Sequence, residues 1–431
     1  MENPSFGTVS LLGLGVSNKA VLSYLSSKNI PVVVRNYEKI DLPKGTFGIF
    51  GKDYLNTCED TVFRSPSVRP DKILGRGKVY TEISYSLEAL GCYKIGITGS
   101  DGKTTTATLC HKILEAGGKG SYLVGNVGTP LITYLDSVKK EDTMVCELSS
   151  FQLFDFVPSL DIAVVTGITP NHLDWHTDLY EYVLSKRNIT KNARRVILPI
   201  DLPSRWLFEG ENVSYFSLGD LSALSGKHAY LKDGYVYYGK KRLFPKEKIK
   251  LLGDFNIKNV LCAVAATYDL VGIEPILRAL STFGGVKHRM ETVAEINGVS
   301  FVDSSIDSTP DRTKCTLSAF DRSRVIAIMG GYDKNLKYDS LKDATNGLYA
   351  LVVMGENRDK ILAKQNASRV FTVNTMDEAV KLAFSLARVG DTVLLSPASA
   401  SFDMYKNYEE KSQAFICAIR GIENGRNKEN S

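Results

Sequence analysis

Short apolar runs alternate with stretches of helical periodicity along most of this 431-residue chain, a pattern typical of parallel α/β sheets. The first repeat has an apolar strand that ends in the turn Gly13-x-Gly15, a helical pattern at 19–27 and a second strand at 31–34. Further short strands are predicted at 47–50 and 61–64. Together these elements predict a small α/β domain that ends near Gly91.

The middle of the chain continues the alternation and departs from it once. Apolar strands are expected at 93–97, 144–147, 162–165 and 195–198. Between residues 215 and 251 the pattern becomes alternating and turn-rich, which predicts a β-hairpin insertion. Beyond a Gly284-Gly285 linker, strands are expected at 300–302, 325–329, 348–354 and 392–395.

The expected fold class is therefore α/β with three domains, at residues 1–91, 92–284 and 285–431. The first and third should be Rossmann-like, and the central one should have a parallel sheet of the P-loop ATPase kind. More than one domain is also expected from length alone, because single hydrophobic cores stop growing well below this size.

Composition excludes some functions without choosing one. The 53 Lys and Arg residues against 48 Asp and Glu give a net charge of +5, and no dense basic block suggests nucleic acid as a partner. The seven scattered cysteines contain no Cys-x-x-Cys, which favours a reducing compartment. The first apolar run is too short for a signal peptide or a membrane span, so a cytoplasmic enzyme is expected. The basic residues near the C-terminus, from Arg420 onward, are predicted to form a solvated tail.

The most informative motif is the glycine-rich loop Gly-Ile-Thr-Gly-Ser-Asp-Gly-Lys-Thr-Thr-Thr at residues 96–106. It follows an apolar strand and leads into a helical stretch at 107–116. Glycines let backbone N–H groups converge on phosphate oxygens, while Lys103 can reach the outer phosphates and Thr104 can hold Mg²⁺. The gaps from Gly96 and Gly99 to Gly102 are five and two residues, whereas the common P-loop has four.

Three polar residues stand where the central sheet should end or be covered. Glu147 ends a strand and could bind a divalent cation, or it could cap a helix or pair with a base. His172 could be a metal ligand or an ordinary loop histidine. Lys186 would ordinarily lie on a solvated helix face.

Other candidates are weaker when taken singly. Asn256 and Asn259 share a helix face and could contact an adenine or cap the helix. Arg289, just after the linker, could clamp phosphate or form an interdomain salt bridge. The Gly13-x-Gly15 turn lacks a third glycine, so a dinucleotide is weakly supported, and a UDP-type ligand and a structural turn both stay open.

Taken together, these segments resemble the Mur ligase family, whose members add amino acids to the UDP-linked peptidoglycan precursor. The shared motifs are the loop at 96–106, Glu-Leu-Ser-Ser-Phe-Gln-Leu from Glu147, His172-Leu-Asp followed by Lys186, the segment 253–259, and His-Arg-Met-Glu from His288. The segment 395–408 resembles the branch that adds D-glutamate. The resemblance implies an ATP-dependent amide ligase that joins D-glutamate to UDP-N-acetylmuramoyl-L-alanine through an acyl phosphate. We expect it to act as a monomer with two Mg²⁺ ions.

The resemblance also implies a role for each matching residue. ATP would be bound by Gly99, Ser100, Asp101, Gly102, Lys103, Thr104, Thr105, Asn256, Asn259, Arg289 and Asp303. Metal ligands would be Thr104, Glu147, His172 and Lys186, the last as a carbamylated lysine, and the catalytic set would be Lys103, Glu147, His172, Lys186 and Arg289. The UDP substrate would meet Gly15, Val16, Ser17, Arg35, Asn36, Ser65 and Asn126. The acceptor amino acid would meet Lys334, Ser401, Tyr408 and Asp307.

Departures from the family pattern lead to two further expectations. In the segment from Val302 the usual Asn-Asp-Ser-Lys-Ala is replaced, so that Asp303 is assigned to the ribose, Ile306 replaces a lysine and Asp307 replaces an alanine. Both of the last two changes make the acceptor region more negative, which predicts relaxed acceptor choice that includes cationic amino acids. The alternative function is a folylpolyglutamate-synthase-like ligase, which shares the phosphate loop and the modified lysine.

Overall fold

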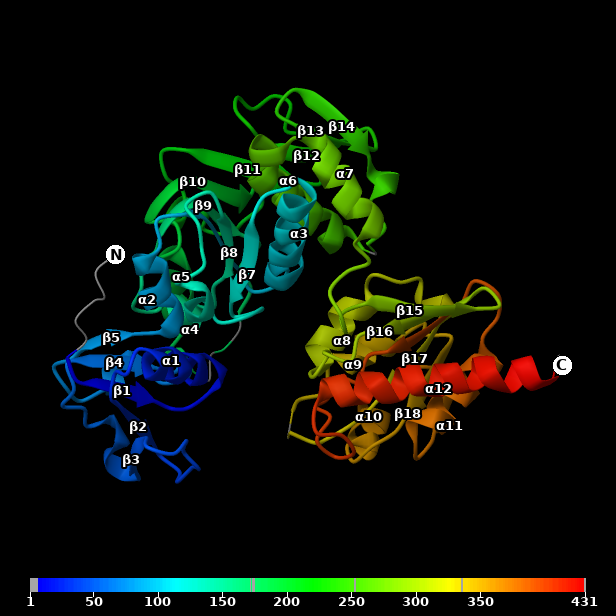
Figure 1. The fold of residues 1–431 in the computed structure, drawn as a ribbon. Coiled ribbons are helices and arrows are strands. Elements are labelled where there is room, and N and C mark those ends of the chain that lie inside the picture. Colours follow the sequence, from blue (N-terminus) through cyan, green and yellow to red (C-terminus); the bar gives the residue numbers. More distant parts are fainter. Residues whose placement is uncertain (1–6, 171, 173–174, 252, 335, 430–431) are drawn as a thin grey trace. The chain divides into compact units, whose positions relative to one another are not determined.

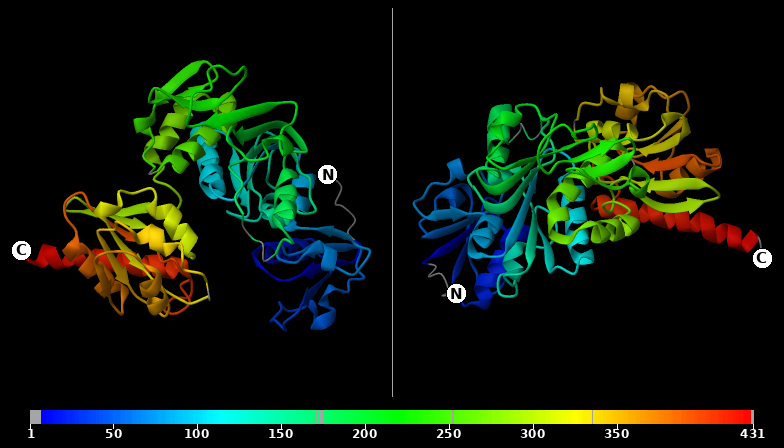
Figure 2. Two further views of the ribbon diagram at one scale, coloured as in Figure 1. Left: turned by 180° about the vertical axis from the view of Figure 1, so that it is seen from behind. Right: turned by 90° about the horizontal axis from the view of Figure 1, so that it is seen from above.

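The chain folds around three β-sheets, shown in Figures 1 and 2. The computed structural model describes residues 7–170, 172, 175–251, 253–334 and 336–429, with side chains as far as residue 423. One compact unit comprises Met1–Ile249 and Ile257–Thr282 and contains the first two sheets. The other comprises Lys250–Asn256 and Phe283–Ser431 and contains the third.

The first sheet is fully parallel, with strand order β3-β2-β1-β4-β5. Its strands are β1 (Val9–Leu12), β2 (Val32–Asn36), β3 (Phe47–Phe50), β4 (Thr61–Arg64) and β5 (Lys78–Tyr80), and its helices are α1 (Val16–Ser27) and α2 (Glu82–Ala89). The chain runs outward from β1 to β3 and then returns to the other side of β1 as β4. A ligand site is therefore expected where β1 and β4 end, because the strand order reverses there.

The central sheet has nine strands in the order β14-β13-β12-β11-β10-β9-β6-β8-β7. Its parallel part comprises β6 (Tyr93–Thr98), β7 (Ser121–Gly125), β8 (Thr143–Glu147), β9 (Ser159–Val165), β10 (Asn192–Pro199), β11 (Val213–Ser217) and β12 (Ala229–Lys232). Its helices are α3 (Lys103–Ala116), α4 (Ser150–Leu153), α5 (Leu179–Arg187), α6 (Asp254–Val271) and α7 (Ile273–Thr282). Since β8 and β9 flank β6, the loops that follow these three strands meet at one edge.

The predicted hairpin insertion is present. Strands β12, β13 (Tyr235–Tyr238) and β14 (Lys241–Pro245) pair antiparallel and extend the sheet beyond β11. The β12–β13 turn is tight, with φ of +47° at Asp233 and +76° at Gly234. Both values are positive, as a two-residue turn that follows the twist of the strands requires.

The third sheet has the order β15-β16-β20-β17-β18-β19 and is parallel except for β15 (Glu291–Ile296). The other strands are β16 (Val299–Asp303), β17 (Val325–Met329), β18 (Ala350–Val353), β19 (Val370–Thr372) and β20 (Thr392–Leu395). The helices are α8 (Pro310–Leu317), α9 (Leu341–Thr345), α10 (Arg358–Lys364), α11 (Met376–Leu386) and α12 (Tyr408–Glu429). Alternate residues of β17 enter two different cores: Ile326 packs with α11 and α12, and Ala327 packs with α8 and α9. Helices thus cover both faces, which explains why these strands are continuously apolar.

The α/β fold class is confirmed, and several helix limits were wrong. Helix α3 begins at Lys103 and not at residue 107, because its first turn contains three threonines that hide the helical pattern. The basic residues near the C-terminus lie on α12, which is helical as far as Glu429, and Arg420 is exposed, as expected for a solvated segment. The exact domain limits at 91 and 284 stay predictions. Among the described residues, no helix is long and apolar enough to cross a membrane.

Candidate active site

The phosphate loop joins β6 to α3 and depends on two glycines with positive φ. Gly99 has φ +148° and Gly102, which precedes the first helical residue, has φ +79°. A Cβ atom on Gly102 would lie 2.3 Å from Oδ1 of Asn259. Glycine at this position therefore meets both a backbone and a packing requirement.

Ser100 fixes the middle of this loop against its neighbours. Its N–H donates to the Gly167 carbonyl at 2.8 Å, and its hydroxyl donates to the Thr169 carbonyl at 2.8 Å. Its oxygen also lies 2.8 Å from the Tyr182 hydroxyl. The Ser100 side chain is thus directed into the protein, while Asp101 is exposed.

Two lysines converge on one carbonyl of the loop. Nζ of Lys103 donates to the Gly99 and Ser100 carbonyls, each at 2.8 Å. Nζ of Lys186, on α5, donates to the same Gly99 carbonyl at 2.8 Å. Lys186 is 2% exposed, and burial followed by the nearby Lys103 charge holds its pKa well below the usual range. Lys186 is therefore buried at the phosphate loop, and the solvated-face alternative is wrong.

Glu147, at the end of β8, has a buried carboxylate in which only one of the two oxygens accepts a hydrogen bond from a described residue. It is 1% exposed, and its Oε1 accepts a hydrogen bond from Nδ2 of Asn126 at 2.8 Å. Its Oε2 has no hydrogen-bond partner among the described residues. A buried anionic oxygen without a donor is costly, so this atom is suited to a bound cation.

The remaining predicted metal ligands lie near the same edge of the central sheet. Thr104 is half-buried in the first turn of α3. His172 is exposed in the segment between β9 and α5, with φ +55°, and its ring centre lies 4.8 Å from that of Phe151. The two residues that follow His172 in the family motif lie outside the described residues. An oxygen-rich set with one histidine and a spare carboxylate oxygen is compatible with Mg²⁺.

The two predicted adenine contacts occupy the start of α6. Asn256 and Asn259 are both buried, and Oδ1 of Asn259 accepts from the Thr106 hydroxyl at 3.4 Å. Because Asn259 also packs against Gly102, the beginning of α6 is attached to the phosphate loop.

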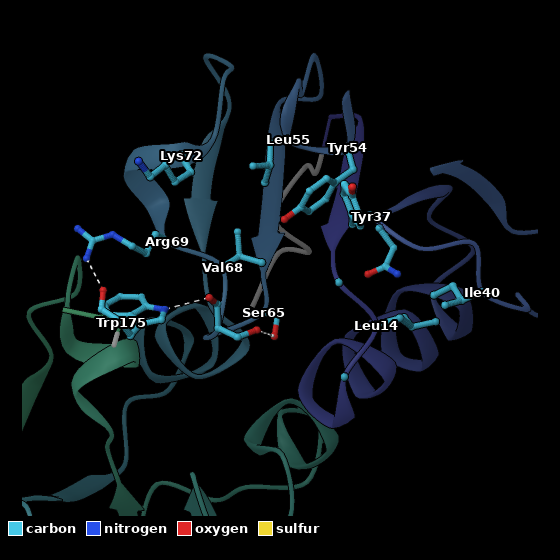
Figure 3. Close-up of a pocket in the computed structure, with 14 residues that line it drawn as sticks. Leu14, Tyr37, Ile40, Tyr54, Leu55, Ser65, Val68, Arg69, Lys72 and Trp175 are labelled. Carbon is cyan, nitrogen blue, oxygen red and sulfur yellow. Dashed lines mark hydrogen bonds between the residues drawn. The ribbon is translucent and has the colours of Figure 1, made fainter. Parts of the chain in front are cut away.

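A separate cavity of about 720 Å³ opens at the carboxyl ends of β1 and β4 (Figure 3). The predicted UDP contacts Gly15, Asn36 and Ser65 line it, and Val16 and Ser17 begin the adjoining helix α1. The cavity also has lining residues that the sequence did not predict. These are Gly13, Leu14, Tyr37, Ile40, Tyr54, Leu55, Ser67, Val68, Arg69, Lys72 and Trp175.

The predicted UDP contact of Arg35 is not supported. Its side chain is buried and does not line the cavity, and NH2 lies 2.9 Å from Oε1 of Glu59. Hydrogen bonding by Arg35 lowers the Glu59 pKa against the opposing effect of burial, which is the largest contribution. Arg35, on β2, therefore belongs to a structural ion pair with a residue just before β4.

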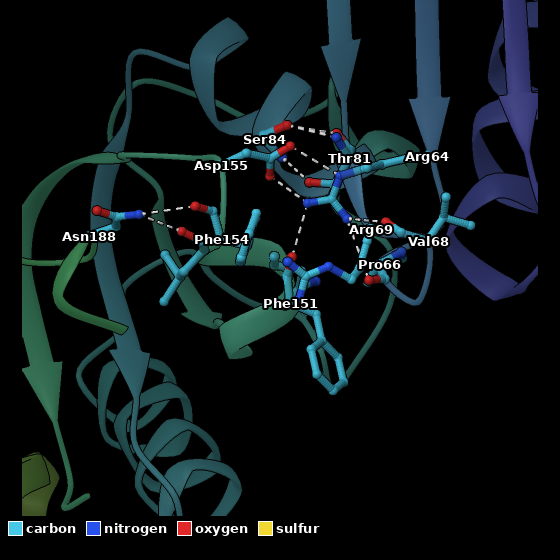
Figure 4. A network of polar contacts seen from close by, with 12 residues as sticks. Arg64, Pro66, Val68, Arg69, Thr81, Ser84, Phe151, Phe154, Asp155 and Asn188 are labelled. Carbon is cyan, nitrogen blue, oxygen red and sulfur yellow. Dashed lines mark hydrogen bonds and ion pairs between the residues drawn. The ribbon is translucent and has the colours of Figure 1, made fainter. Parts of the chain in front are cut away.

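Two arginines, one at the end of β4 and one in the loop that follows, connect the first sheet with the central part of the same unit (Figure 4). Arg64 is fully buried, is ion-paired with Asp155 and donates to the Phe151 carbonyl at 2.9 Å. Arg69 donates to both carboxylate oxygens of Glu181 at 3.0 Å, which lowers the Glu181 pKa to about 2. Its other donors reach Asp71 and the Trp175 carbonyl.

In the other unit, Arg289 follows His288, whose side chain is held by several hydrogen-bonding contacts. Arg289 is half-buried and adjoins His288, which has φ +64°. Nδ1 of His288 lies 3.0 Å from Oδ2 of Asp303 and 2.8 Å from the Ser412 hydroxyl. Asp303 is fully buried and also accepts from the Ser305 N–H at 2.8 Å. Its assignment to the ribose stays a prediction, and these contacts give it no support.

Asp307 likewise differs from its predicted surroundings. It is 4% exposed, and its Oδ2 accepts from the Thr316 hydroxyl at 2.7 Å and from the Ser396 hydroxyl at 2.8 Å. Burial raises its pKa. The structure therefore does not support Asp307 as a charge that faces the acceptor amino acid.

The other predicted acceptor residues lie on loops at one rim of the third sheet. The loop after β17 carries Lys334 and the loop after β20 carries Ser401, and the two loops meet where the Tyr332 N–H donates to the Ala400 carbonyl at 2.9 Å. Nζ of Lys334 lies 5.3 Å from the ring centre of Phe402. Tyr408 begins α12, with its ring centre 5.7 Å from that of His288.

The chain matches two family models: the Mur ligase middle domain over residues 97–267 and the Mur ligase glutamate ligase domain over residues 288–399. A UDP-N-acetylmuramoylalanine–D-glutamate ligase of Clostridium perfringens is 36% identical, covering 96% of each chain. One from Clostridium botulinum is 37% identical, covering 94% of this chain and 95% of its own. This chain belongs to the Mur ligase family.

Solved Mur ligase structures share the fold at low identity. The UDP-N-acetylmuramate-alanine ligase of Thermotoga maritima superposes with a TM-score of 0.59 at 18% identity, covering 96% of this chain and 99% of its own. A pseudomurein peptide ligase of Methanothermus fervidus gives a TM-score of 0.58 at 18% identity, covering 96% and 100%. The three-domain α/β architecture of the Mur ligases is therefore that of this chain.

The residues missed in this Mur ligase are those that become neighbours only in the fold. Arg69 and Trp175 are 106 positions apart in the sequence, yet the Arg69 guanidinium carbon lies 4.9 Å from the indole centre. Trp175 stands three positions after His172, so the motif drew attention to this segment of the sequence. The sequence did not show that Trp175 would contact Arg69. For Tyr37 and Tyr54, aromatic residues beside the ends of parallel strands were the available signal.

Proposed function

We propose that this Mur ligase joins D-glutamate to UDP-N-acetylmuramoyl-L-alanine at the expense of ATP, as the names of its relatives state for those proteins. The arrangement at the phosphate loop carries the proposal. Lys186 and the loop meet at Gly99, and Glu147 presents an unpaired carboxylate oxygen at the end of a neighbouring strand. A nucleotide-binding switch would need the loop but neither of these two buried groups.

The ATP phosphates are assigned to the loop from Gly99 to Thr105. Its N–H groups and the start of α3 favour anions, and Lys103 would exchange loop carbonyls for phosphate oxygens. Asn256 and Asn259 are assigned to the adenine, and Arg289 to phosphate. These assignments follow the family motifs residue by residue.

Thr104, Glu147, His172 and Lys186 would hold two Mg²⁺ ions. Bound there, Mg²⁺ would offset the charge of the phosphates and of the substrate carboxylate. Lys186 would contribute as a carbamate: its neutral amine attacks CO₂, an N–C bond forms and a proton leaves, which yields a carboxylate. The lowered pKa of Lys186 favours the neutral amine that this step needs.

The reaction has two steps. The substrate carboxylate attacks the γ-phosphorus of ATP, so that ADP leaves and an acyl phosphate forms. The amine of D-glutamate then attacks the acyl carbon, and the tetrahedral intermediate expels phosphate and loses a proton. Because neither step forms a covalent bond to the protein, the protein contributes alignment and charge neutralisation by Lys103 and Arg289.

Lys334, Ser401 and Tyr408 are assigned to the acceptor. A lysine and a hydroxyl suit the carboxylates of D-glutamate. Relaxed acceptor choice is not carried forward, because one of its two bases was a charge at Asp307 that the fold buries. We further propose a monomer that works in the cytoplasm, with UDP bound in the cavity beside Gly15.

The test is phosphate release from ATP, measured with the purified protein and Mg²⁺. Release should require both UDP-N-acetylmuramoyl-L-alanine and D-glutamate and should stay at background with L-lysine or with a pteroylglutamate substrate. Release with a pteroylglutamate and L-glutamate would instead favour the folylpolyglutamate-synthase-like alternative. Release that ignores the amino acid would contradict ligation.

A further inference from the structure

Trp175 lines the cavity at the carboxyl ends of β1 and β4. Figure 3 places it with Arg69 on one side, across from Tyr37 and Ile40. The cavity therefore has an aromatic wall at each end, and a UDP-sugar would extend between them.

The two ends are chemically different. At one end, Asn36 offers an amide that can hydrogen-bond to the edge of a base. Tyr37 and Tyr54 line the same end, with their ring centres 6.1 Å apart. Between the ends, Gly15 begins α1, where backbone N–H groups favour a diphosphate. The uridine end of a UDP-sugar thus fits the tyrosine side of the cavity.

The sugar must then lie toward Trp175, because the reacting carboxylate is attached to the sugar and has to reach the phosphate loop. Trp175 belongs to the segment between β9 and α5, which also contains His172 and leads to Lys186 on α5. It is therefore the lining residue that adjoins the reaction centre along the chain.

The indole is held rigidly before any ligand arrives. Its Nε1 donates to the Ser67 carbonyl at 2.9 Å, and the Arg69 guanidinium carbon lies 4.9 Å from the ring centre. Arg69 is in turn fixed by Glu181 and Asp71, which accept four of its hydrogen bonds. A fixed aromatic surface binds with little loss of side-chain entropy.

From this arrangement, and on the basis of the proposed function, we infer that Trp175 is the platform for the sugar of the UDP substrate, with the part of its indole that lines the cavity against the pyranose ring. Arg69 is a positioning residue, since its donors are occupied by Asp71, Glu181 and the Trp175 carbonyl. Through Trp175 the site binds UDP-sugars more tightly than uridine nucleotides that lack the sugar.

Intrinsic fluorescence gives a direct test, because the chain has two tryptophans and the other, Trp206, is 73% exposed. The Trp206→Phe variant leaves Trp175 as the only tryptophan and should retain normal kinetics. Saturating UDP-N-acetylmuramoyl-L-alanine should change its emission, whereas saturating UDP should not. Calorimetry on the same sample verifies that each ligand is bound.

Kinetics of Trp175 variants supply the second measurement. Trp175→Leu should raise KM for UDP-N-acetylmuramoyl-L-alanine about tenfold, which corresponds to one lost aromatic contact, and leave inhibition by UDP unchanged. Trp175→Phe should keep most of the affinity and controls for misfolding.

Equal emission changes with UDP and with the full substrate would overturn the inference, as would equal weakening of both ligands by Trp175→Leu. If wild-type protein binds no UDP-N-acetylmuramoyl-L-alanine by calorimetry, the proposed function fails instead.

Discussion

Two regions of the first unit contain buried charged side chains, and they differ in how fully those charges are compensated by partners. Around the phosphate loop, Lys103 and Lys186 share the Gly99 carbonyl, and Glu147 keeps an oxygen without a partner among the described residues. Where the first sheet meets the central part, Arg64 is matched by Asp155 and carbonyls, and Arg69 by Glu181 and Asp71.

This difference separates groups that await a ligand from groups that hold the fold. A buried charge without compensation is costly, so it persists where a bound phosphate or cation supplies the missing partner. A buried charge with all its hydrogen bonds made contributes specificity to the packing. Removing side chains from the first region should therefore cost activity, and removing them from the second should cost stability.

The largest effect is expected from Lys186→Ala. It should lower kcat by about 10³-fold, because the carbamate that would hold Mg²⁺ at the phosphates is lost, without lowering the unfolding midpoint. Steady-state phosphate release and urea unfolding measure the two quantities. Added short carboxylic acids should restore part of the activity by replacing the carbamate.

Lys191→Ala is the matched control for this variant, since Lys191 is exposed just beyond α5. It should change neither quantity. A Lys186→Ala protein with full activity would show that the metal-bridging role is wrong.

The second effect is on stability. Arg64→Met should lower the free energy of unfolding by about 3 kcal/mol, because the Val68 and Phe151 carbonyls and Asp155 would all lose the buried guanidinium that donates to them. Combining it with Asp155→Leu should recover part of that loss. Urea unfolding followed by circular dichroism measures both variants, and kcat at saturating substrates should stay near the wild-type value.

Arg194→Met provides the exposed counterpart, because the Arg194 side chain is 84% exposed and is paired with Asp161 at 3.0 Å. Its effect should be close to zero. An equally small effect of Arg64→Met would remove the distinction between the two regions.

The sequence predicted the first region much better than the second. The phosphate loop is a contiguous motif, and Glu147 and Lys186 occur in segments with recognisable neighbours. Arg64 and Arg69 meet partners about 90 to 110 positions away, and no local pattern encodes such pairings. Strands buried on both faces were also predictable, whereas the first turns of α1 and α3 were not. Ser17 and Asn18 in α1 and the threonines in α3 interrupt the helical periodicity there.

A smaller, pH-dependent effect is expected at Glu181. Its pKa falls from 4.5 to about 2 in the folded protein, so its stabilisation is complete above pH 4.5 and is lost as pH falls toward 2. Glu181→Gln should therefore unfold more easily than wild type at neutral pH, by about 1 kcal/mol. The gap between the two proteins should close between pH 4.5 and 2.

Glu274→Gln, in an exposed turn of α7, is the control and should show no such closing gap. Midpoints of thermal unfolding across this pH range give the comparison. A gap for Glu181→Gln that stays constant down to pH 2 would show that Arg69 does not depress the Glu181 pKa.

The smallest effect is expected at Asp307, a buried acid whose hydrogen bonds are already made. Asp307→Asn can still accept from the Thr316 and Ser396 hydroxyls through its amide oxygen, so KM for D-glutamate should stay within about twofold. Lys334→Met, on the exposed rim, should raise that KM instead. If Asp307→Asn shifted the choice among amino acids, the acid would act on the acceptor after all, and burial with satisfied hydrogen bonds would no longer separate structural from functional charges in this chain.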